Sequence, residues 1–204
     1  MIRNILLLSL MIICSACSKP EVADFINTAS NTHYQKFDRY GKVMDDKAGP
    51  WQCVLDPNSG LLWENKTDDD GVHHYGWTYT WYEADQSREE RESLFRDGSC
   101  ESSRKGSCTT LGFIDKANRE KLCGKTHWRL PTRHELESII DRSRKEQLPL
   151  IATGIFSHTK TSSYWTSSKD ENGETIYAVN FLDGSGGYYA RKGAFYVRLV
   201  HDAD

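Results

Sequence analysis

The chain has 204 residues, and its 26 Lys and Arg against 29 Asp and Glu give a formal net charge of −3 at pH 7. No basic block stands out, so binding to nucleic acid is not expected, because phosphate neutralisation supplies most of the sequence-independent affinity for DNA and RNA. The length suits one domain of about 150 residues with an extension.

The start of the chain has the layout of a bacterial export signal. One Arg precedes an apolar run over residues 5–13, which is too short to span a bilayer. The small residues Ser15 and Ala16 stand directly before Cys17, as in a lipobox. This pattern predicts a signal peptide over residues 1–16 and acylation of Cys17, which would anchor the protein in a membrane. If Cys17 stays unmodified, the protein is simply secreted.

A polar stretch follows the anchor position. Residues 17–47 have few large apolar side chains and are predicted to form a lipid-anchored tether, although the later part, YQKFDRYGKV, is compatible with a first strand. The folded domain is expected over residues 48–204. We expect the protein in the cell envelope, and Ser18 favours the outer membrane over the inner one if the host is Gram-negative.

The domain predicts a mixture of strands and helices. WQCVLDPNSGLLWEN, which begins at Trp51, predicts a β-hairpin around a strong turn sequence. Residues 109–123 predict a helix capped by Thr109 or Thr110. A second helix is expected from Thr132, because Thr132 and Glu135 fit a capping box. The C-terminal third is β-rich, and the alternation in ETIYAVNFL predicts a strand with one solvated face.

Four cysteines follow the lipobox. In an oxidising compartment an even number predicts two disulfides. Cys100 and Cys108 flank a flexible Ser- and Gly-containing segment, so we pair them with each other, which leaves Cys53 for Cys123. The competing interpretation is a zinc site, but the spacings are not those of zinc ligands and no metal is expected.

The segment CGKTHWRLPTRHEL, which begins at Cys123, could be read as an active site, a metal site or a scaffold corner. A scaffold explains most of it, since Gly124 suits a left-handed position after a helix and Pro131 precedes the helix cap. His127 and His134 are seven residues apart across a proline, which is not a helical metal-ligand spacing.

A family resemblance becomes specific at this segment. LCGKTHWRLPTRHELESII resembles the signature CG..DWRLPT..EL..L of the Lcl C-terminal domain family, and VLDPNSGLLWENKT resembles its opening D..TGL.WE.KT. WTYTWY, YWTSS, IYAVNFLDG and YVRLV are similar to further family segments, in the family's order, so the resemblance covers residues 51–201. It implies a compact α+β domain similar to C-type lectins and formylglycine-generating enzymes, with two helices and a twisted antiparallel sheet. His127 and Leu199 depart from the family's usual Asp and Cys.

The resemblance implies a non-enzymatic module for adhesion or polysaccharide binding. Aromatic rings beside turns and Arg side chains are the candidate ligand contacts, although each also has a structural role open to it as core filler or salt-bridge partner. The candidates are Trp77, Trp81, Tyr164, Trp165, Tyr188, Tyr189, Arg191, Arg129, Arg133 and Arg198. The alternative is a structural or assembly protein of the envelope that binds a protein partner.

No catalytic group or cofactor is expected. A formylglycine-generating enzyme needs a reactive cysteine pair near the C-terminus, and this chain has no cysteine after Cys123; GxSxG and HExxH are also absent from the sequence. The acidic residues 68–70 and the segment 170–172 could hold a lectin-type calcium ion or be solvated loops. The first segment is not an EF-hand, because Lys66 and Trp77 stand where acidic ligands are needed.

Overall fold

The computed structural model describes residues 33–84, 98–100 and 108–203, which lie in one compact unit spanning Thr32–Asp204. The predicted signal peptide, Cys17 and the first part of the tether lie outside the described residues. Within the described ranges, no helix is both long enough and apolar enough to cross a membrane.

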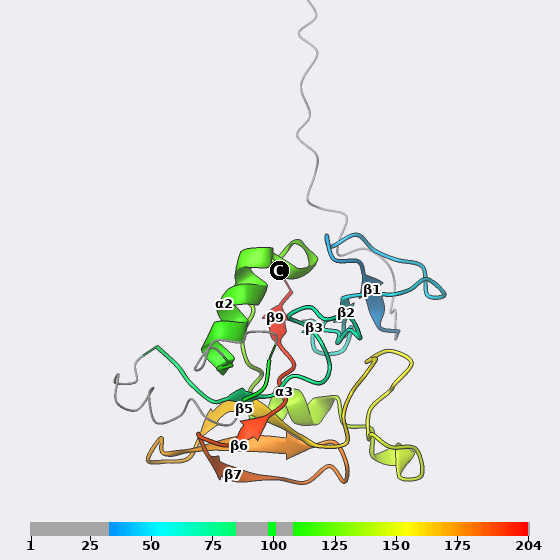
Figure 1. Ribbon diagram of the computed structural model, residues 1–204. Helices are drawn as coiled ribbons and strands as arrows, with labels where there is room; N and C mark the ends of the chain where they lie inside the picture. The colour runs from blue at the N-terminus through cyan, green and yellow to red at the C-terminus, as the bar shows by residue number, and fades with distance from the viewer. Residues whose placement is uncertain (1–32, 85–97, 101–107, 204) are drawn as a thin grey trace, which may run out of the picture. The chain divides into compact units, whose positions relative to one another are not determined.

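A four-stranded antiparallel sheet joins the two ends of the domain. Its strand order is β1-β2-β3-β9, which brings the last strand beside the third (Figure 1). The four strands are β1 (Gln35–Phe37), β2 (Cys53–Leu55), β3 (Leu61–Glu64) and β9 (Val200–Asp202). β1 lies in the stretch assigned to the tether and pairs with β2, so the folded unit begins before residue 48.

The predicted hairpin is confirmed as β2 and β3. Its turn is held by the Asp56 carboxylate, which accepts hydrogen bonds from the Asn58 backbone N–H at 2.9 Å and the Ser59 hydroxyl at 2.8 Å. Gly60 then takes φ 71°, a left-handed conformation that glycine adopts without steric cost.

The described strands form two further sheets, so the domain has three sheets in place of the single sheet that was expected. β5 (Ser163–Lys169), β6 (Thr175–Asn180) and β7 (Gly186–Ala190) form an antiparallel sheet in that order. β4 (Tyr79–Thr80) pairs with β8 (Ala194–Phe195). The α+β class is therefore confirmed, with antiparallel strands throughout these sheets, while the closer likeness to C-type lectins stays a prediction.

The solvated face predicted for β6 is wrong. Ile176 and Ala178 pack into one hydrophobic core, and Tyr177 and Val179 pack into a second core on the other face of the strand. The sequence alternation separates these two cores instead of separating core from water. Figure 1 shows α3 lying against this sheet, which is why its second face is covered.

Both predicted helices are confirmed. α2 (Thr110–Glu120) is capped at its N-terminus by Thr109, whose hydroxyl accepts from the Gly112 backbone N–H. α3 (Arg133–Ser138) is capped at its N-terminus by Thr132 and has both hydrogen bonds of the capping box. Two short 3-10 turns, η2 (Leu122–Gly124) and η3 (Arg142–Arg144), follow α2 and α3. Gly124 has the expected positive φ, although the cap of α2 itself is Lys121.

Both disulfides form as predicted, Cys53–Cys123 and Cys100–Cys108. The first links β2 to η2 across 70 residues of sequence, whereas the second closes a segment of 8 residues. In the chain-entropy account, the longer loop restricts the unfolded chain more and therefore stabilises the fold more.

Replacing Cys53 and Cys123 together by Ser should lower the free energy of unfolding by about 4 kcal/mol, against about 2.5 kcal/mol for replacing Cys100 and Cys108. Urea unfolding of both double variants measures the difference. A larger loss for the Cys100 and Cys108 pair would contradict the assignment of the long-range bridge as the principal covalent constraint.

Candidate functional site

Three of the predicted aromatic contacts belong to the core. Tyr164 and Trp165 are fully buried and Trp81 nearly so, and the indole N–H groups of Trp81 and Trp165 donate to the carbonyls of Thr166 and Tyr79 at 2.9 and 2.8 Å. These three rings therefore have no face available to a ligand, and the expectation that they offer one is corrected.

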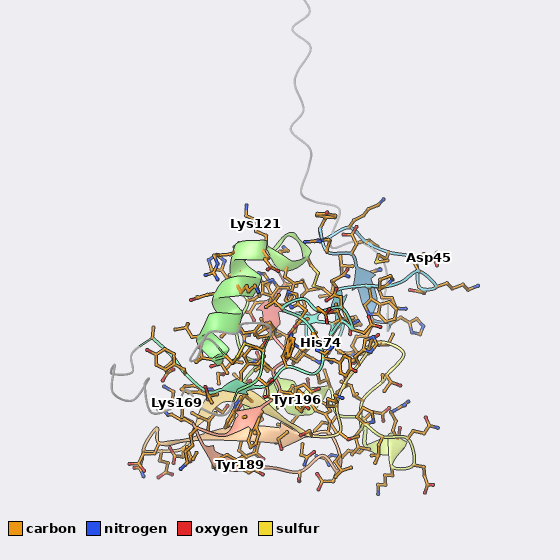
Figure 2. All side chains as sticks on the ribbon, in the orientation of Figure 1. Asp45, His74, Lys121, Lys169, Tyr189 and Tyr196 are labelled. Carbon is orange, nitrogen blue, oxygen red and sulfur yellow. A yellow bond between two sulfur atoms is a disulfide. The ribbon has the colours of Figure 1, made fainter. Side chains whose placement is uncertain are left out.

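The remaining aromatic candidates are accessible but separated. Tyr188 and Tyr189 are 50% and 42% exposed on β7. Consecutive residues of a strand point to opposite faces, so Tyr188 meets Tyr177 edge to face while Tyr189 meets Phe195. Figure 2 labels Tyr189. β7 therefore does not gather them into one contact surface.

The predicted Arg contacts have intramolecular partners. Arg129 pairs with Glu135 at 2.8 Å and with Asp202 at 2.6 Å, and these hydrogen bonds raise its pKa. Arg191 lies 4.9 Å from the centre of the Trp81 ring and donates to the Gly173 carbonyl.

Two further Arg side chains also have structural roles. Arg133 pairs with Glu137 on the next turn of α3 at 2.9 Å. Arg198 is fully buried and donates to the Glu64 carbonyl at 2.6 Å and to the Thr159 hydroxyl at 2.8 Å.

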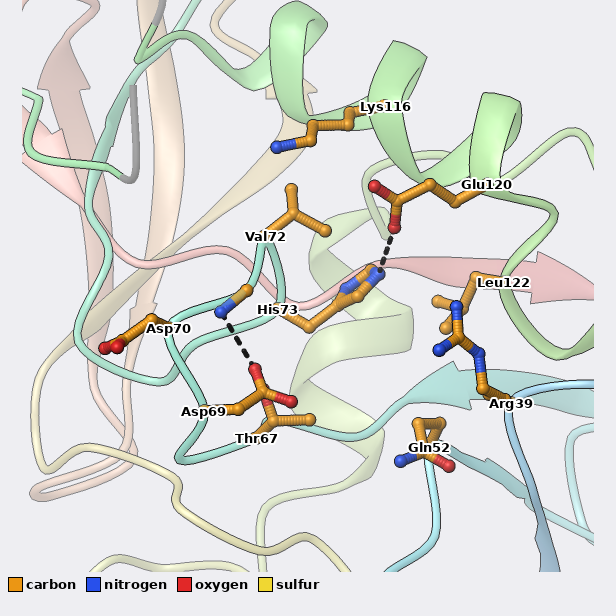
Figure 3. Close-up of a pocket in the computed structure, with 11 residues that line it drawn as sticks. Arg39, Gln52, Thr67, Asp69, Asp70, Val72, His73, Lys116, Glu120 and Leu122 are labelled. Carbon is orange, nitrogen blue, oxygen red and sulfur yellow. Dashed lines mark hydrogen bonds and ion pairs between the residues drawn. The ribbon is translucent and has the colours of Figure 1, made fainter. Parts of the chain in front are cut away.

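A polar cleft of about 310 Å³ lies between α2, the start of β2 and the loop that follows β3. Helix α2 contributes Lys116 and Glu120 on one side, and the loop of residues 67–73 faces them (Figure 3). Its lining consists of Arg39, Gln52, Thr67, Asp69, Asp70, Gly71, Val72, His73, Lys116, Glu120 and Leu122.

A buried carboxylate lies beneath this cleft. Glu64, the last residue of β3, is fully buried, and its Oε1 accepts from the Lys66 ammonium at 2.7 Å and contacts His73 Nδ1 at 2.8 Å. Its Oε2 accepts from the Leu199 backbone N–H at 2.9 Å. Glu64 and Lys66 are two residues apart in an extended segment, so their side chains point to the same side.

The partners of Glu64 keep it ionised. Desolvation alone would raise the pKa of Glu64, but the charges and hydrogen bonds of Lys66 and His73 outweigh this effect and lower the pKa to about 2. Desolvation also lowers the pKa of Lys66, against the attraction of Glu64. At neutral pH a carboxylate that can only accept hydrogen bonds therefore lies behind His73, one of the residues that line the cleft.

The ionised Glu64 fixes the tautomer of His73. Because the carboxylate only accepts, Nδ1 of His73 carries the proton that it shares with Glu64. In the neutral imidazole Nε2 is then an acceptor, and in the imidazolium it is a donor. This atom is buried and has no hydrogen-bond partner among the described residues, and Figure 3 marks its ion-pair contact with Glu120 Oε2, at 3.9 Å.

A strip of aromatic rings continues from the same loop. The ring of Trp77 lies 4.9 Å from that of His74, and the ring of His74 lies 4.5 Å from that of Tyr75. Tyr75 stacks on His158 at 5.5 Å, and the Lys160 ammonium lies 4.4 Å from the Tyr75 ring. We call Trp77, His74, Tyr75 and His158 the aromatic strip.

The strip and the cleft are joined through Trp77. Its indole N–H donates to the carbonyl of Gly71, a residue that lines the cleft, at 2.9 Å. All four rings are at least partly exposed, so a chain-like ligand can contact them. Trp77 is thus the one predicted tryptophan that the structure places at an accessible site.

The acidic segments considered for calcium are engaged in turns. Asp69 Oδ1 accepts from the Thr67 hydroxyl and the Gly71 backbone N–H, both at 2.9 Å. Asp170 accepts from Thr175 and from the Glu174 backbone N–H, which lowers its pKa. In the described ranges, no group of three or more His, Cys, Asp or Glu side chains is placed to hold a metal ion.

Sequence reasoning missed the polar residues of the cleft. Glu64 and Lys66 were considered only as part of the predicted hairpin, the family motif and the excluded EF-hand, and His73 and Glu120 were not singled out. The signal that could have found them is an acid and a base two residues apart at the end of an otherwise apolar strand, because both side chains enter the core together and need each other there.

Replacing Glu64 by Gln should lower the free energy of unfolding at pH 7 by about 3–5 kcal/mol, because Lys66 is left buried without its counter-charge. In the native protein, the stability that Glu64 contributes is present above pH 4.5 and is lost as pH falls toward 2. Urea unfolding across this pH range measures both effects.

The control is Glu120→Gln, which removes a half-exposed carboxylate and should change stability by less than about 1 kcal/mol. An unchanged acid dependence in the Glu64→Gln variant would show that another group controls acid stability.

The sequence profile of the Lcl C-terminal domain family matches residues 52–201. This range includes β2 to the middle of β9, both disulfides, most of the cleft and the whole aromatic strip. No curated protein matches the chain.

Proposed function

The chain belongs to the Lcl C-terminal domain family, and we propose that it is a lipid-anchored protein of the cell envelope whose domain binds a polysaccharide without catalysis. The aromatic strip beside the polar cleft carries this proposal. Binding sites for small or extended ligands combine aromatic surface with a few convergent polar groups, and here residues 67–77 contribute to both.

Each part of this surface has a chemical match in a sugar chain. The faces of Trp77 and Tyr75 can contact the apolar faces of sugar rings. Carboxylates and amides of the cleft, such as Glu120 and Gln52, can bind hydroxyls. Lys160, beside Tyr75, adds a cation at the far end of the strip.

A polysaccharide array, with and without calcium, tests the proposal on the mature protein. Saturable binding to at least one polysaccharide is expected, and Tyr75→Ala should weaken it about 3- to 10-fold through loss of the ring contact. Tyr188→Ala, which removes an equally large exposed ring from β7, should leave binding unchanged. Weakening by Tyr188→Ala alone would place the site on β7, and no binding to any polysaccharide would contradict the proposal.

The second candidate is an assembly protein that binds a protein partner. Among the described strands, β7 pairs only with β6, so its outer edge is open in that part of the chain, and it carries two exposed tyrosines. An open edge can add a strand from another protein. Copurification with an envelope protein, lost on replacing Tyr188 and Tyr189, would favour this function.

The anchor is proposed from residues outside the described ranges. Cys17→Ser should release the protein from the membrane fraction, because the acylated thiol is removed. Detergent phase partition and labelling with a fatty-acid analogue measure the change. Cys14→Ser is the matched control and should leave the protein anchored; release by Cys14→Ser alone would move the modification to that residue.

A further inference from the structure

We propose that the open edge of β7 pairs with the same edge of a second copy of this chain, in antiparallel orientation about a two-fold axis at Tyr188. The inference goes beyond polysaccharide binding and does not depend on it. It concerns the edge that the second candidate function assigns to another protein, and it names the occupant of that edge.

The edge strand lacks the features that normally prevent pairing. β7 reads GGYYA, without Pro or a charged side chain, and four of its five residues are exposed. Figure 1 shows β7 as the outermost strand of its sheet, beside β6, and among the described residues no strand pairs with its outer edge. Folded proteins usually protect such an edge with charges, Pro or a covering segment. An edge without this protection can accept another strand.

The pairing of β7 with β6 determines which of its backbone groups point outward. The Asn180 N–H donates to the Ser185 carbonyl at 2.8 Å, which extends the β6–β7 register by one hydrogen-bonded pair. Opposed residues of an antiparallel pair alternate between hydrogen-bonded and non-hydrogen-bonded pairs, so every second residue of β7 faces away from β6. The residues whose N–H and C=O groups point away from β6 are Gly186, Tyr188 and Ala190.

These outward groups select one register for two copies. Antiparallel pairing centred on Tyr188 places Tyr188 opposite its copy and places Gly186 opposite Ala190 on both sides of the axis. A shift of register in either direction moves an end pair into the turns that flank β7. The Ala190 carbonyl already accepts from the Gly193 N–H at 3.0 Å, but a carbonyl oxygen has a second lone pair. The pairing centred on Tyr188 therefore uses more of the outward groups than any other.

The side chains of β7 fit this register. Gly187 lies opposite Tyr189 of the second copy, and a glycine has no side chain to occupy the space of that ring. The two Tyr188 rings lie side by side across the axis, on the face where Tyr188 already meets Tyr177. Both tyrosines of β7 are exposed in the single chain, so pairing removes part of their apolar surface from water.

The charges at the two ends of β7 favour the antiparallel orientation. Asp183 precedes the strand, and Arg191 and Lys192 follow it. Antiparallel pairing brings the acidic end of each copy beside the basic end of the other, whereas parallel pairing brings like charges together. Lys192 is the exposed cation at the basic end, because Arg191 lies 4.9 Å from the centre of the Trp81 ring. The end charges are therefore self-complementary.

The pairing should be weak in solution and stronger on a membrane. A contact along an edge of five residues is smaller than the interfaces of about 1,200 Å² and more that hold stable complexes. The lipid anchor proposed at Cys17 would hold two copies in one layer and raise their effective concentration. Pairing at the β7 edge would then be favoured in the anchored protein.

Sedimentation equilibrium of the Cys17→Ser protein, which has no thiol to acylate, tests the proposal from about 1 μM to about 1 mM. We expect a monomer–dimer equilibrium with a dissociation constant of roughly 10–500 μM. Tyr188→Lys should weaken it about tenfold, because two like charges then lie opposite each other at the axis. The matched control is Tyr40→Lys, which places the same charge at a tyrosine that is 77% exposed in the segment after β1, and it should leave the dimer unchanged.

Amide hydrogen exchange, followed by NMR, tests whether the β7 edge is the contact. Protection of the Gly186, Tyr188 and Ala190 N–H groups should rise with protein concentration, because pairing removes them from water. The N–H groups of Gly187 and Tyr189 point toward β6 and should not respond to concentration. A dimer that protects other amides and leaves these three unchanged would overturn the proposal.

Failure of this inference can be separated from failure of the proposed function. Monomers at every concentration would overturn self-pairing, and so would equal weakening by Tyr188→Lys and Tyr40→Lys. A monomer that binds polysaccharide through Tyr75 would leave the proposed function intact. A monomer that copurifies with an envelope protein through Tyr188 and Tyr189 would assign the edge to another protein, against self-pairing.

Discussion

The carboxylate of Glu64 is the interaction on which the domain and its cleft depend. It receives hydrogen bonds from Lys66 and from the Leu199 backbone and contacts His73, so one buried charge connects β3, the following loop and the segment before β9. Such a charge is tolerated in a core only when its partners are complete. Because His73 lines the cleft, its contact with Glu64 also holds one cleft residue in place.

Covalent and apolar constraints support the same region. The Cys53–Cys123 bridge joins β2, the neighbour of β3, to the turn after α2, and α2 supplies one wall of the cleft. Phe113 of α2 packs in the first core, and the Lys66 ammonium lies 4.5 Å from its ring. The helix, the bridge and the buried ion pair thus connect the parts of the chain that line the cleft.

Local signals explain what could be predicted from the sequence. The turn at Asp56, the cap at Thr109 and the box of Thr132 and Glu135 are short-range hydrogen-bond patterns, so their residues reveal them directly. The division into three sheets could not be predicted, because it depends on which distant strands pair, as β3 does with β9.

The difference between local and long-range contacts also explains which site residues were predicted from the sequence and which were missed. Trp165 and Tyr189 are both aromatic residues in predicted strands, yet one is fully buried and the other 42% exposed. Residue type alone does not distinguish them, since burial depends on what packs against each face. His73 and Glu120 are 47 positions apart in the sequence and meet only because α2 lies across the loop from His73.

If Cys17 carries the proposed lipid anchor, the early start of the folded unit restricts how far the domain can stand from the membrane. β1 begins at Gln35, 18 positions after Cys17. A chain anchored at Cys17 would therefore have a connecting segment whose fully extended length is about 60 Å. A connecting segment that reached to residue 48 would have had an extended length of roughly 100 Å at the same rise per residue. A domain held this closely samples a thin layer next to the lipid, where its local concentration is high. Its partners are then molecules that enter that layer, and modest affinity at the cleft is sufficient to retain them.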